Sequence, residues 1–179
     1  MGGIQRLCRE YGTLLVMDEV ACGFGRTGRL FASEHFGIEP DILCLGKAIT
    51  AGYAGMGATV VTPRVADEVG DRAEFWSTYG WHPLAVDAAL ANLRLWKRRG
   101  ASLLKGGAAE SEYLRGRLSE MEFAHQAQIN GRGLAIGLEV GSEQYAEELQ
   151  ARCREGGLLV SAEDEPGRLA FVIRKKVPG

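Results

Sequence analysis

The chain has 179 residues, of which 46% are hydrophobic and 25% are charged, and its formal net charge is −2. These values are ordinary for a globular protein, and they offer no electrostatic argument for binding nucleic acid or a membrane surface. No apolar run approaches the roughly 20 residues that a membrane span requires. The length suits one domain or one and a half.

The cysteines and histidines do not have the sequence spacing that is typical of metal ligands. None of the cysteines lies in a Cys-x-x-Cys pair; they are Cys8, Cys22, Cys44 and Cys153. The histidines are equally dispersed; they are His35, His82 and His125. We therefore expect no metal site, and we expect reduced thiols. Because no signal-peptide pattern is visible at the start, we also expect a cytoplasmic location.

The first half of the chain predicts helices that alternate with short buried strands. Short apolar runs between glycines, prolines and charged residues indicate strands of a parallel sheet. Pro83 suits the first turn of a long helix. The expected elements are a helix at 3–11, strands at 13–17, 41–45 and 58–61, a helix at 64–70 and a helix at 82–98 that ends or is interrupted at Gly100.

The second half predicts a smaller α/β segment. The expected elements are a helix at 102–121 broken or kinked around Gly106–Gly107, strands at 134–140, 158–161 and 168–173, and a helix at 143–155. Strands alternating with helices predict an α/β fold class. We expect a domain boundary between residues 99 and 100, which gives domains of 1–99 and 100–179.

Two polar residues stand at the ends of predicted strands. Asp18 ends the apolar run 14–17, and Lys47 follows the apolar run 42–45. A lysine and an aspartate in such positions are the minimum that a protein supplies for pyridoxal phosphate chemistry. The lysine forms a Schiff base with the aldehyde, and the carboxylate keeps the pyridine nitrogen protonated.

Two phosphate-binding motifs compete with this interpretation. The run 23–28, GFGRTG, matches the dinucleotide fingerprint G-x-G-x-x-G, but four residues separate it from the preceding strand, and Asp41 precedes its strand instead of ending it. Gly46-Lys47 suggests a P-loop, which would need glycine in place of Asp41 and serine or threonine in place of Ala48. Both motifs fail their structural requirements.

The surrounding residues resemble a known family. The segments are DEVACGFGRTGRLFA at 18–32, PDILCLGKAIT at 40–50 and STYGWHPLA at 77–85. In order and spacing they are similar to the class III (ω-type, subgroup II) pyridoxal-phosphate-dependent aminotransferases. The resemblance implies fold type I, with residues 1–99 forming the C-terminal part of the cofactor-binding large domain and its linking helix, and 100–179 a small C-terminal domain, expected to be incomplete.

The resemblance also implies a role for each matching residue. Lys47 would form the Schiff base and transfer the proton, and Asp18 would pair with the pyridinium nitrogen. Val20 would pack against the ring, and Thr78 would bind the cofactor phosphate of the neighbouring subunit in a homodimer. The implied activity is transamination from an amine or ω-amino acid to a 2-oxo acid. Two alternatives stay open: a non-catalytic or truncated remnant, and an isomerase or aminomutase on the same scaffold.

The chain also departs from the family pattern. Ala21 stands where many relatives have glutamine, and Trp81-His82 stands where they often have Gly-Asn, so the amino donor stays open. Arg26 could meet a substrate carboxylate or form a structural ion pair. The family's N-terminal portion is not in the sequence, so we expect a fragment that exposes a sheet edge, binds the cofactor poorly alone and tends to associate.

Overall fold

The computed structural model describes residues 2–72, 77–162 and 168–172. The chain forms two compact units, Met1–Leu104 and Lys105–Gly179, called here the first and second unit. Among the described residues, no helix combines the length and apolarity needed to cross a membrane. The domain boundary between residues 99 and 100 stays a prediction, because compactness alone does not define independent domains.

The first unit is built on a three-stranded sheet of mixed direction. Its elements are α1 (Gly2–Glu10), β1 (Val16–Asp18), a 3₁₀ helix η1 (Ala32–Phe36), β2 (Ile42–Leu45), a 3₁₀ helix η2 (Lys47–Thr50), β3 (Ala58–Val61), α2 (Pro63–Val69), a 3₁₀ turn η3 (Gly70–Arg72) and the start of α3 (Pro83–Ser119). The strand order is β1-β2-β3, with β1 parallel and β3 antiparallel to β2. The predicted strands at 41–45 and 58–61 are confirmed.

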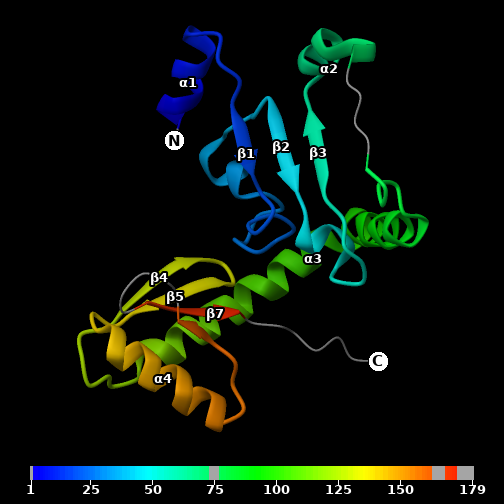
Figure 1. Ribbon diagram of the computed structural model, residues 1–179. Coiled ribbons are helices and arrows are strands. Elements are labelled where there is room, and N and C mark those ends of the chain that lie inside the picture. The colour runs from blue at the N-terminus through cyan, green and yellow to red at the C-terminus, as the bar shows by residue number, and fades with distance from the viewer. Residues whose placement is uncertain (1, 73–76, 163–167, 173–179) are drawn as a thin grey trace. The chain divides into compact units, whose positions relative to one another are not determined.

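Strand β1 differs from its prediction in extent and burial. It begins at Val16 instead of Thr13, and the Val16 side chain is 51% exposed, so the strand is not buried on both faces. The strand also lies at the edge of the sheet, where one side of it has no hydrogen-bonded neighbour within the described residues (Figure 1). The apolar run alone did not distinguish an edge strand from a central one.

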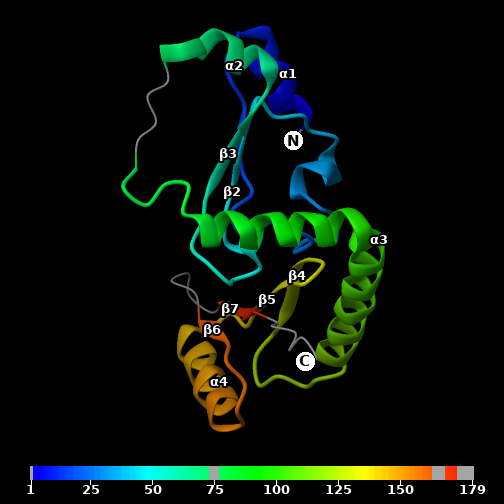
Figure 2. The same ribbon diagram turned by 90° about the vertical axis from the view of Figure 1, so that its right-hand side faces the viewer.

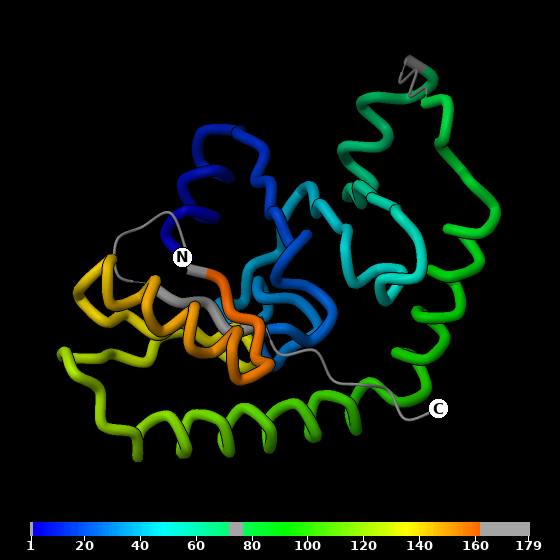
Figure 3. The backbone as a smooth tube through the Cα atoms, turned by 60° about the horizontal axis from the view of Figure 1, so that its bottom comes forward, coloured from blue at the N-terminus to red at the C-terminus, as the bar shows by residue number. Residues whose placement is uncertain are grey.

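Helix α3 runs from Pro83 to Ser119, so the predicted end or interruption at Gly100 and the predicted break at Gly106–Gly107 are wrong, whereas the alternative of a kink at Gly106–Gly107 stays a prediction. Figure 3 traces it as one unbroken coil. A glycine costs a helix only about 1 kcal/mol relative to alanine, and tertiary packing of a helix face readily outweighs that cost. Buried residues lie on both sides of these glycines, among them Ala89 before them and Leu118 after them.

The second unit is an antiparallel sheet with a helix packed on it and the last part of α3 hydrogen-bonded to it. Its elements after α3 are β4 (Gln128–Arg132), β5 (Ala135–Glu139), α4 (Glu143–Glu155), β6 (Ser161–Ala162) and β7 (Arg168–Val172), in the sheet order β4-β5-β7-β6. Leu138, Val140 and Ala146 form its buried core. The predicted helix at 143–155 is confirmed, and Ser142 caps it by accepting a hydrogen bond from the Tyr145 amide at 3.3 Å.

Two strand predictions in this unit need correction. The predicted strand at 158–161 is displaced to Ser161–Ala162, and β4 was not predicted. Asn130-Gly131 has the composition of a turn, yet both residues pair with β5. Gly131 has φ +111°, and a Cβ there would collide with the carbonyl oxygen of Ala135, so the strand accepts only glycine at this point. Residue 173 of the predicted last strand lies outside the described residues.

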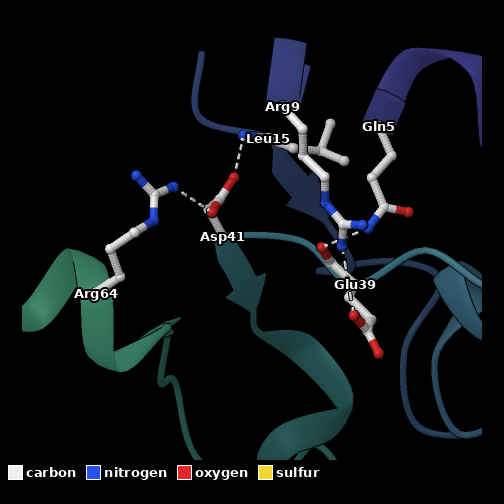
Figure 4. A network of polar contacts seen from close by, with 6 residues as sticks. All are labelled: Gln5, Arg9, Leu15, Glu39, Asp41 and Arg64. Carbon is white, nitrogen blue, oxygen red and sulfur yellow. Dashed lines mark hydrogen bonds and ion pairs between the residues drawn. The ribbon is translucent and has the colours of Figure 1, made fainter. Parts of the chain in front are cut away.

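A polar network holds the helices α1 and α2 at the amino ends of β1 and β2 (Figures 1 and 4). The Asp41 carboxylate accepts hydrogen bonds from the Leu15 amide at 2.9 Å and from the Arg64 guanidinium at 2.6 Å. Gln5 donates to the Glu39 carbonyl, and Arg9 pairs with the Glu39 carboxylate at 3.5 Å. The Leu15 amide and the Arg64 guanidinium both lower the pKa of Asp41 below its usual value.

The substitution Asp41→Asn is expected to destabilise the first unit in a pH-dependent way. Because the folded pKa is depressed, the contribution of Asp41 is complete above its unfolded value of about 3.9 and is lost as pH falls through the folded pKa. The difference in urea midpoint between the wild type and Asp41→Asn should therefore be constant from about pH 7 to pH 5 and shrink below about pH 4. Tryptophan fluorescence measures it, since all three tryptophans lie within residues 1–104.

Glu39→Gln serves as the matched control in the same network. The Arg9–Glu39 pair is exposed and 3.5 Å long, so its loss should leave the midpoint unchanged at every pH. Equal midpoints for Asp41→Asn and Glu39→Gln at pH 7 would contradict the assignment of Asp41 as the anchor of this end of the sheet.

Candidate functional site

Asp18 and Lys47 lie at the same edge of the first unit's sheet. Strands β1 and β2 are parallel, and Asp18 at the end of β1 pairs with Cys44 in β2, three residues before Lys47. Neighbouring strands lie about 4.8 Å apart, so the end of β1 and the end of β2 lie side by side, and each is followed or ended by one of the two residues. Ligands of open parallel sheets bind outside the carboxyl ends of the strands, and Asp18 and Lys47 stand at the carboxyl ends of β1 and β2.

The Asp18 carboxylate is oriented by its own loop. Its Oδ1 atom accepts a hydrogen bond from the Val20 amide at 2.9 Å, and the residue is exposed. Within the described part of the chain, no hydrogen bond reaches Oδ2. One carboxylate oxygen is thus held by the backbone, and the other is left to meet a ligand.

Val20 contacts the segment that carries Lys47. A Cβ placed on Gly46 would lie 3.2 Å from a methyl carbon of Val20, closer than most side-chain contacts. A larger residue at position 46 would therefore require Val20 to shift by a few tenths of an ångström, while the extended backbone there is open to any residue. The close approach brings three of the predicted site residues, Asp18, Val20 and Lys47, into one small region.

Lys47 itself begins the short helix η2 in a strained conformation. Its φ is +43°, which a non-glycine residue adopts rarely and at a cost of about 1–2 kcal/mol. The turn closes with a second left-handed residue, Ala51, at φ +52°. Strain of this kind persists only where neighbouring contacts hold it, and it is concentrated at functional sites. The Lys47 side chain is exposed.

Directly after Asp18, the buried carboxylate of Glu19 fastens the loop that leaves the sheet. Its Oε2 accepts the Ala32 amide at 2.9 Å, and its Oε1 accepts the Ser33 amide at 2.7 Å, at the start of η1. The Glu19 amide donates to the Cys44 carbonyl at 2.9 Å. Glu19 thereby ties the Asp18 segment both to β2 and to η1.

On the other side, helix α3 supports the turn that contains Lys47. Figure 2 shows the first part of α3 crossing the ends of β2 and β3. Asn92 of α3 donates to the carbonyl oxygens of Ala48 at 2.8 Å and of Ile49 at 3.1 Å. Ala89 packs with Leu45 and Ile49 in the buried core of this unit.

The glycine-rich run 23–28 is a tight loop packed against α3. Gly25 has φ +87°, and a Cβ there would lie 2.7 Å from an indole carbon of Trp96. The glycine therefore permits both the backbone turn and the approach of the helix. Arg26 in this loop is partly buried, and its role stays a prediction.

Thr78 is not brought together with Asp18 and Lys47. It lies in the exposed turn 77–81 before α3, and among the described residues it has no hydrogen bond to either of them. Trp81 in the same turn has φ +60° and is exposed, as is His82. The predicted contact of Thr78 with a neighbouring subunit is not tested by a single chain and stays a prediction.

The donor set at this sheet edge fits pyridoxal phosphate. An exposed lysine amine can hold the aldehyde carbon, and a carboxylate with one unengaged oxygen can meet the ring nitrogen. By contrast, the described residues contain no group of three or more His, Cys, Asp or Glu side chains that could hold a metal ion.

Sequence reasoning missed the two residues that hold the site in place, Glu19 and Asn92. A signal existed for each. Glu19 directly follows Asp18 in the motif, and Asn92 interrupts a stripe of apolar residues spaced for one helix face, namely Ala85, Ala89 and Trp96. A lone amide or carboxylate at a buried position needs hydrogen-bond partners, which makes it a structural or functional candidate.

Comparison with known proteins gives one consistent result. The family description "Aminotransferase class-III" matches residues 1–174. An acetylornithine aminotransferase from Archaeoglobus fulgidus is 42% identical over 164 residues, which cover 90% of this chain and 40% of that protein. An adenosylmethionine-8-amino-7-oxononanoate aminotransferase from Staphylococcus aureus is 34% identical and covers 88% of this chain and 38% of its own length.

Solved structures agree with the sequence relatives. A thermostable omega transaminase 6-fold mutant from Pseudomonas jessenii superposes with a TM-score of 0.85 at 29% identity, over 95% of this chain and 41% of that one. An (S)-enantioselective omega-transaminase from Thermomicrobium roseum gives 0.80 at 32% identity, over 94% and 40%. The chain thus spans about two fifths of the length of the relatives that it matches.

Proposed function

Because this chain belongs to the class-III aminotransferase family, we propose that it carries the lysine-bearing part of a pyridoxal-phosphate-dependent transaminase site. The fold is the α/β fold type I of these enzymes, as the sequence predicted. The proposed activity moves an amino group from an amine or an ω-amino acid to a 2-oxo acid. The observation that carries the proposal is the placement of Asp18 and Lys47 at adjacent parallel strand ends.

Each residue of the proposed site has a distinct task. Nζ of Lys47 would hold the cofactor through its aldehyde carbon and, once the donor amine has displaced it, would accept the proton from the donor's amine-bearing carbon. When bound, pyridoxal phosphate supplies an electron-withdrawing ring that stabilises negative charge on that carbon. The Asp18 carboxylate would keep the ring nitrogen protonated. Val20, beside Gly46, would present an apolar side chain to the ring.

We also propose that the active assembly is a homodimer in which Thr78 binds the cofactor phosphate of the neighbouring subunit. The exposed turn 77–81 supports this proposal. Tyr79 and Trp81 in the same turn are 84% and 81% exposed, and neighbouring exposed aromatic side chains are typical of an interaction surface.

The test is trapping of the cofactor on the 179-residue chain. The protein is incubated with pyridoxal phosphate and reduced with borohydride, which converts the bond to Lys47 into a stable secondary amine. Mass spectrometry of the peptides should then find one pyridoxyl group, on Lys47, and Lys47→Ala should lose it. Absence of the adduct, or adducts spread over other lysines equally in wild type and variant, would refute the proposal for this chain.

A further inference from the structure

The turn that begins with Lys47 combines an unusual backbone conformation with few backbone hydrogen bonds of its own. Its first and closing residues, Lys47 and Ala51, are both non-glycine residues with left-handed backbones. Inside the turn, the Ile49 amide donates to the Gly46 carbonyl and the Ala51 amide to the Ala48 carbonyl, each at 3.0 Å. Two hydrogen bonds of this length are ordinary for a 3₁₀ turn and do not select a left-handed first residue.

Asn92 supplies the additional constraint. The Nδ2 atom of its side-chain amide donates to the Ala48 carbonyl at 2.8 Å and to the Ile49 carbonyl at 3.1 Å. Asn92 and Ile49 are both buried, so neither partner can turn to water instead. Donation from one planar amide to two successive carbonyls restricts the directions of both, and thereby the orientation of the peptides next to Lys47.

Apart from Asn92, the face of α3 that packs on this turn carries only apolar side chains. Ala85, Ala89 and Trp96 share this face at helical spacing, and Ala89 lies in the core with Leu45 and Ile49. An apolar residue at position 92 would be enough to bury the face. A buried amide is costly unless it is hydrogen-bonded, so its presence here indicates a directional requirement and not a need for burial.

We propose that Asn92 is a positioning residue for Lys47. By holding the Ala48 and Ile49 carbonyls, it keeps the turn in the conformation that aims Nζ of Lys47 at the edge of the sheet where Asp18 lies. This inference rests on the proposed function of Lys47. A displacement of about 1 Å at a reacting group can cost about 100-fold in rate, so loss of this constraint should be visible in the reactivity of the lysine.

Two variants of Asn92 test the proposal against one matched control. Asn92→Leu keeps approximately the size and removes both donors, whereas Asn92→Asp keeps the shape and turns a carboxylate oxygen toward the carbonyls. The control is Val65→Ala, which opens a cavity at a buried position in α2 and lowers stability without touching the turn. The first readout is the rate of pyridoxyl labelling of Lys47, corrected for the folded fraction and measured from pH 6 to pH 9. The second readout is amide hydrogen exchange at Ile49 and Ala51.

Both Asn92 variants should label Lys47 at least about tenfold more slowly than the wild type at every pH, and Val65→Ala should label at the wild-type rate. Wild-type labelling rates in Asn92→Leu would overturn the proposal, as would equal losses in Asn92→Leu and Val65→Ala.

The second readout separates this inference from the proposed function. If the wild type is not labelled at Lys47, the proposed function fails, and hydrogen exchange alone then decides whether Asn92 holds the turn. Faster exchange at Ile49 and Ala51 in Asn92→Leu, but not in Val65→Ala, would support the conclusion that Asn92 holds the turn. Unchanged exchange at these amides in Asn92→Leu would overturn that conclusion.

Discussion

Replacement of Glu19 by glutamine is expected to lower the free energy of unfolding of the first unit by about 2–4 kcal/mol. The Glu19 side chain is 1% exposed, and its two oxygens accept the amides of Ala32 and Ser33. Glutamine can replace only one of these acceptors. Its NH₂ group would face the other backbone N–H, which leaves two donors opposed in a place that water does not reach.

The measurement is urea unfolding followed by tryptophan fluorescence, which reports on the first unit. Glu34→Gln is the matched control. Glu34 lies in η1, the short helix whose first amides Glu19 binds, and its exposed side chain accepts a hydrogen bond from one backbone amide, that of Phe31, at 2.9 Å. The control should lose about 1 kcal/mol or less. If Glu19→Gln were no more destabilising than Glu34→Gln, the buried carboxylate would not be the anchor of this loop.

Replacement of Leu138 by alanine is expected to destabilise the second unit by about 2–5 kcal/mol. Leu138 is 2% exposed, and it packs with Val140 and Ala146 in the only buried cluster found among the described residues of that unit. Truncation to alanine removes apolar contacts and leaves a cavity that a small sheet-and-helix core can fill only partly. The loss is a large share of the stability of so small a unit.

Hydrogen exchange of the amides that pair β4 with β5 measures this effect, because the second unit contains no tryptophan. Exchange in Leu138→Ala should be faster by about 30-fold or more, which corresponds to about 2 kcal/mol. Leu159→Ala is the matched control, since that leucine is 76% exposed and its truncation should leave exchange unchanged. Equal exchange in both variants would show that the unit does not depend on this core.

Elements with local signals could be predicted from the sequence. Helix α4 has a serine cap at Ser142, a glutamate in its first turn and arginines in its last turn, and its bounds were predicted correctly. Strands β2 and β3 are short apolar runs with polar or proline boundaries. Where local and tertiary preferences disagreed, the prediction failed, as for the glycines inside α3 and the Asn-Gly pair inside β4.

The chemical identity of the candidate site was also present in the sequence. Asp18 and Lys47 were recognised from residue type, position after apolar runs and spacing, and the parallel pairing of β1 and β2 confirms that they share one sheet edge. Thr78 was recognised from the same family resemblance, and its role remains a prediction because it concerns a second copy of the chain.

The sequence by itself therefore singled out the amine and the carboxylate of the proposed site, because those residues lie at the ends of strands whose patterns are local. Only the tertiary structure decided what holds them in place. Glu19 reaches amides 13 and 14 residues away, and Asn92 reaches carbonyls 43 and 44 residues away. Such bonds depend on how a loop or a helix packs on the sheet, and a directional hydrogen bond between distant residues has no periodicity along the chain by which it could be predicted.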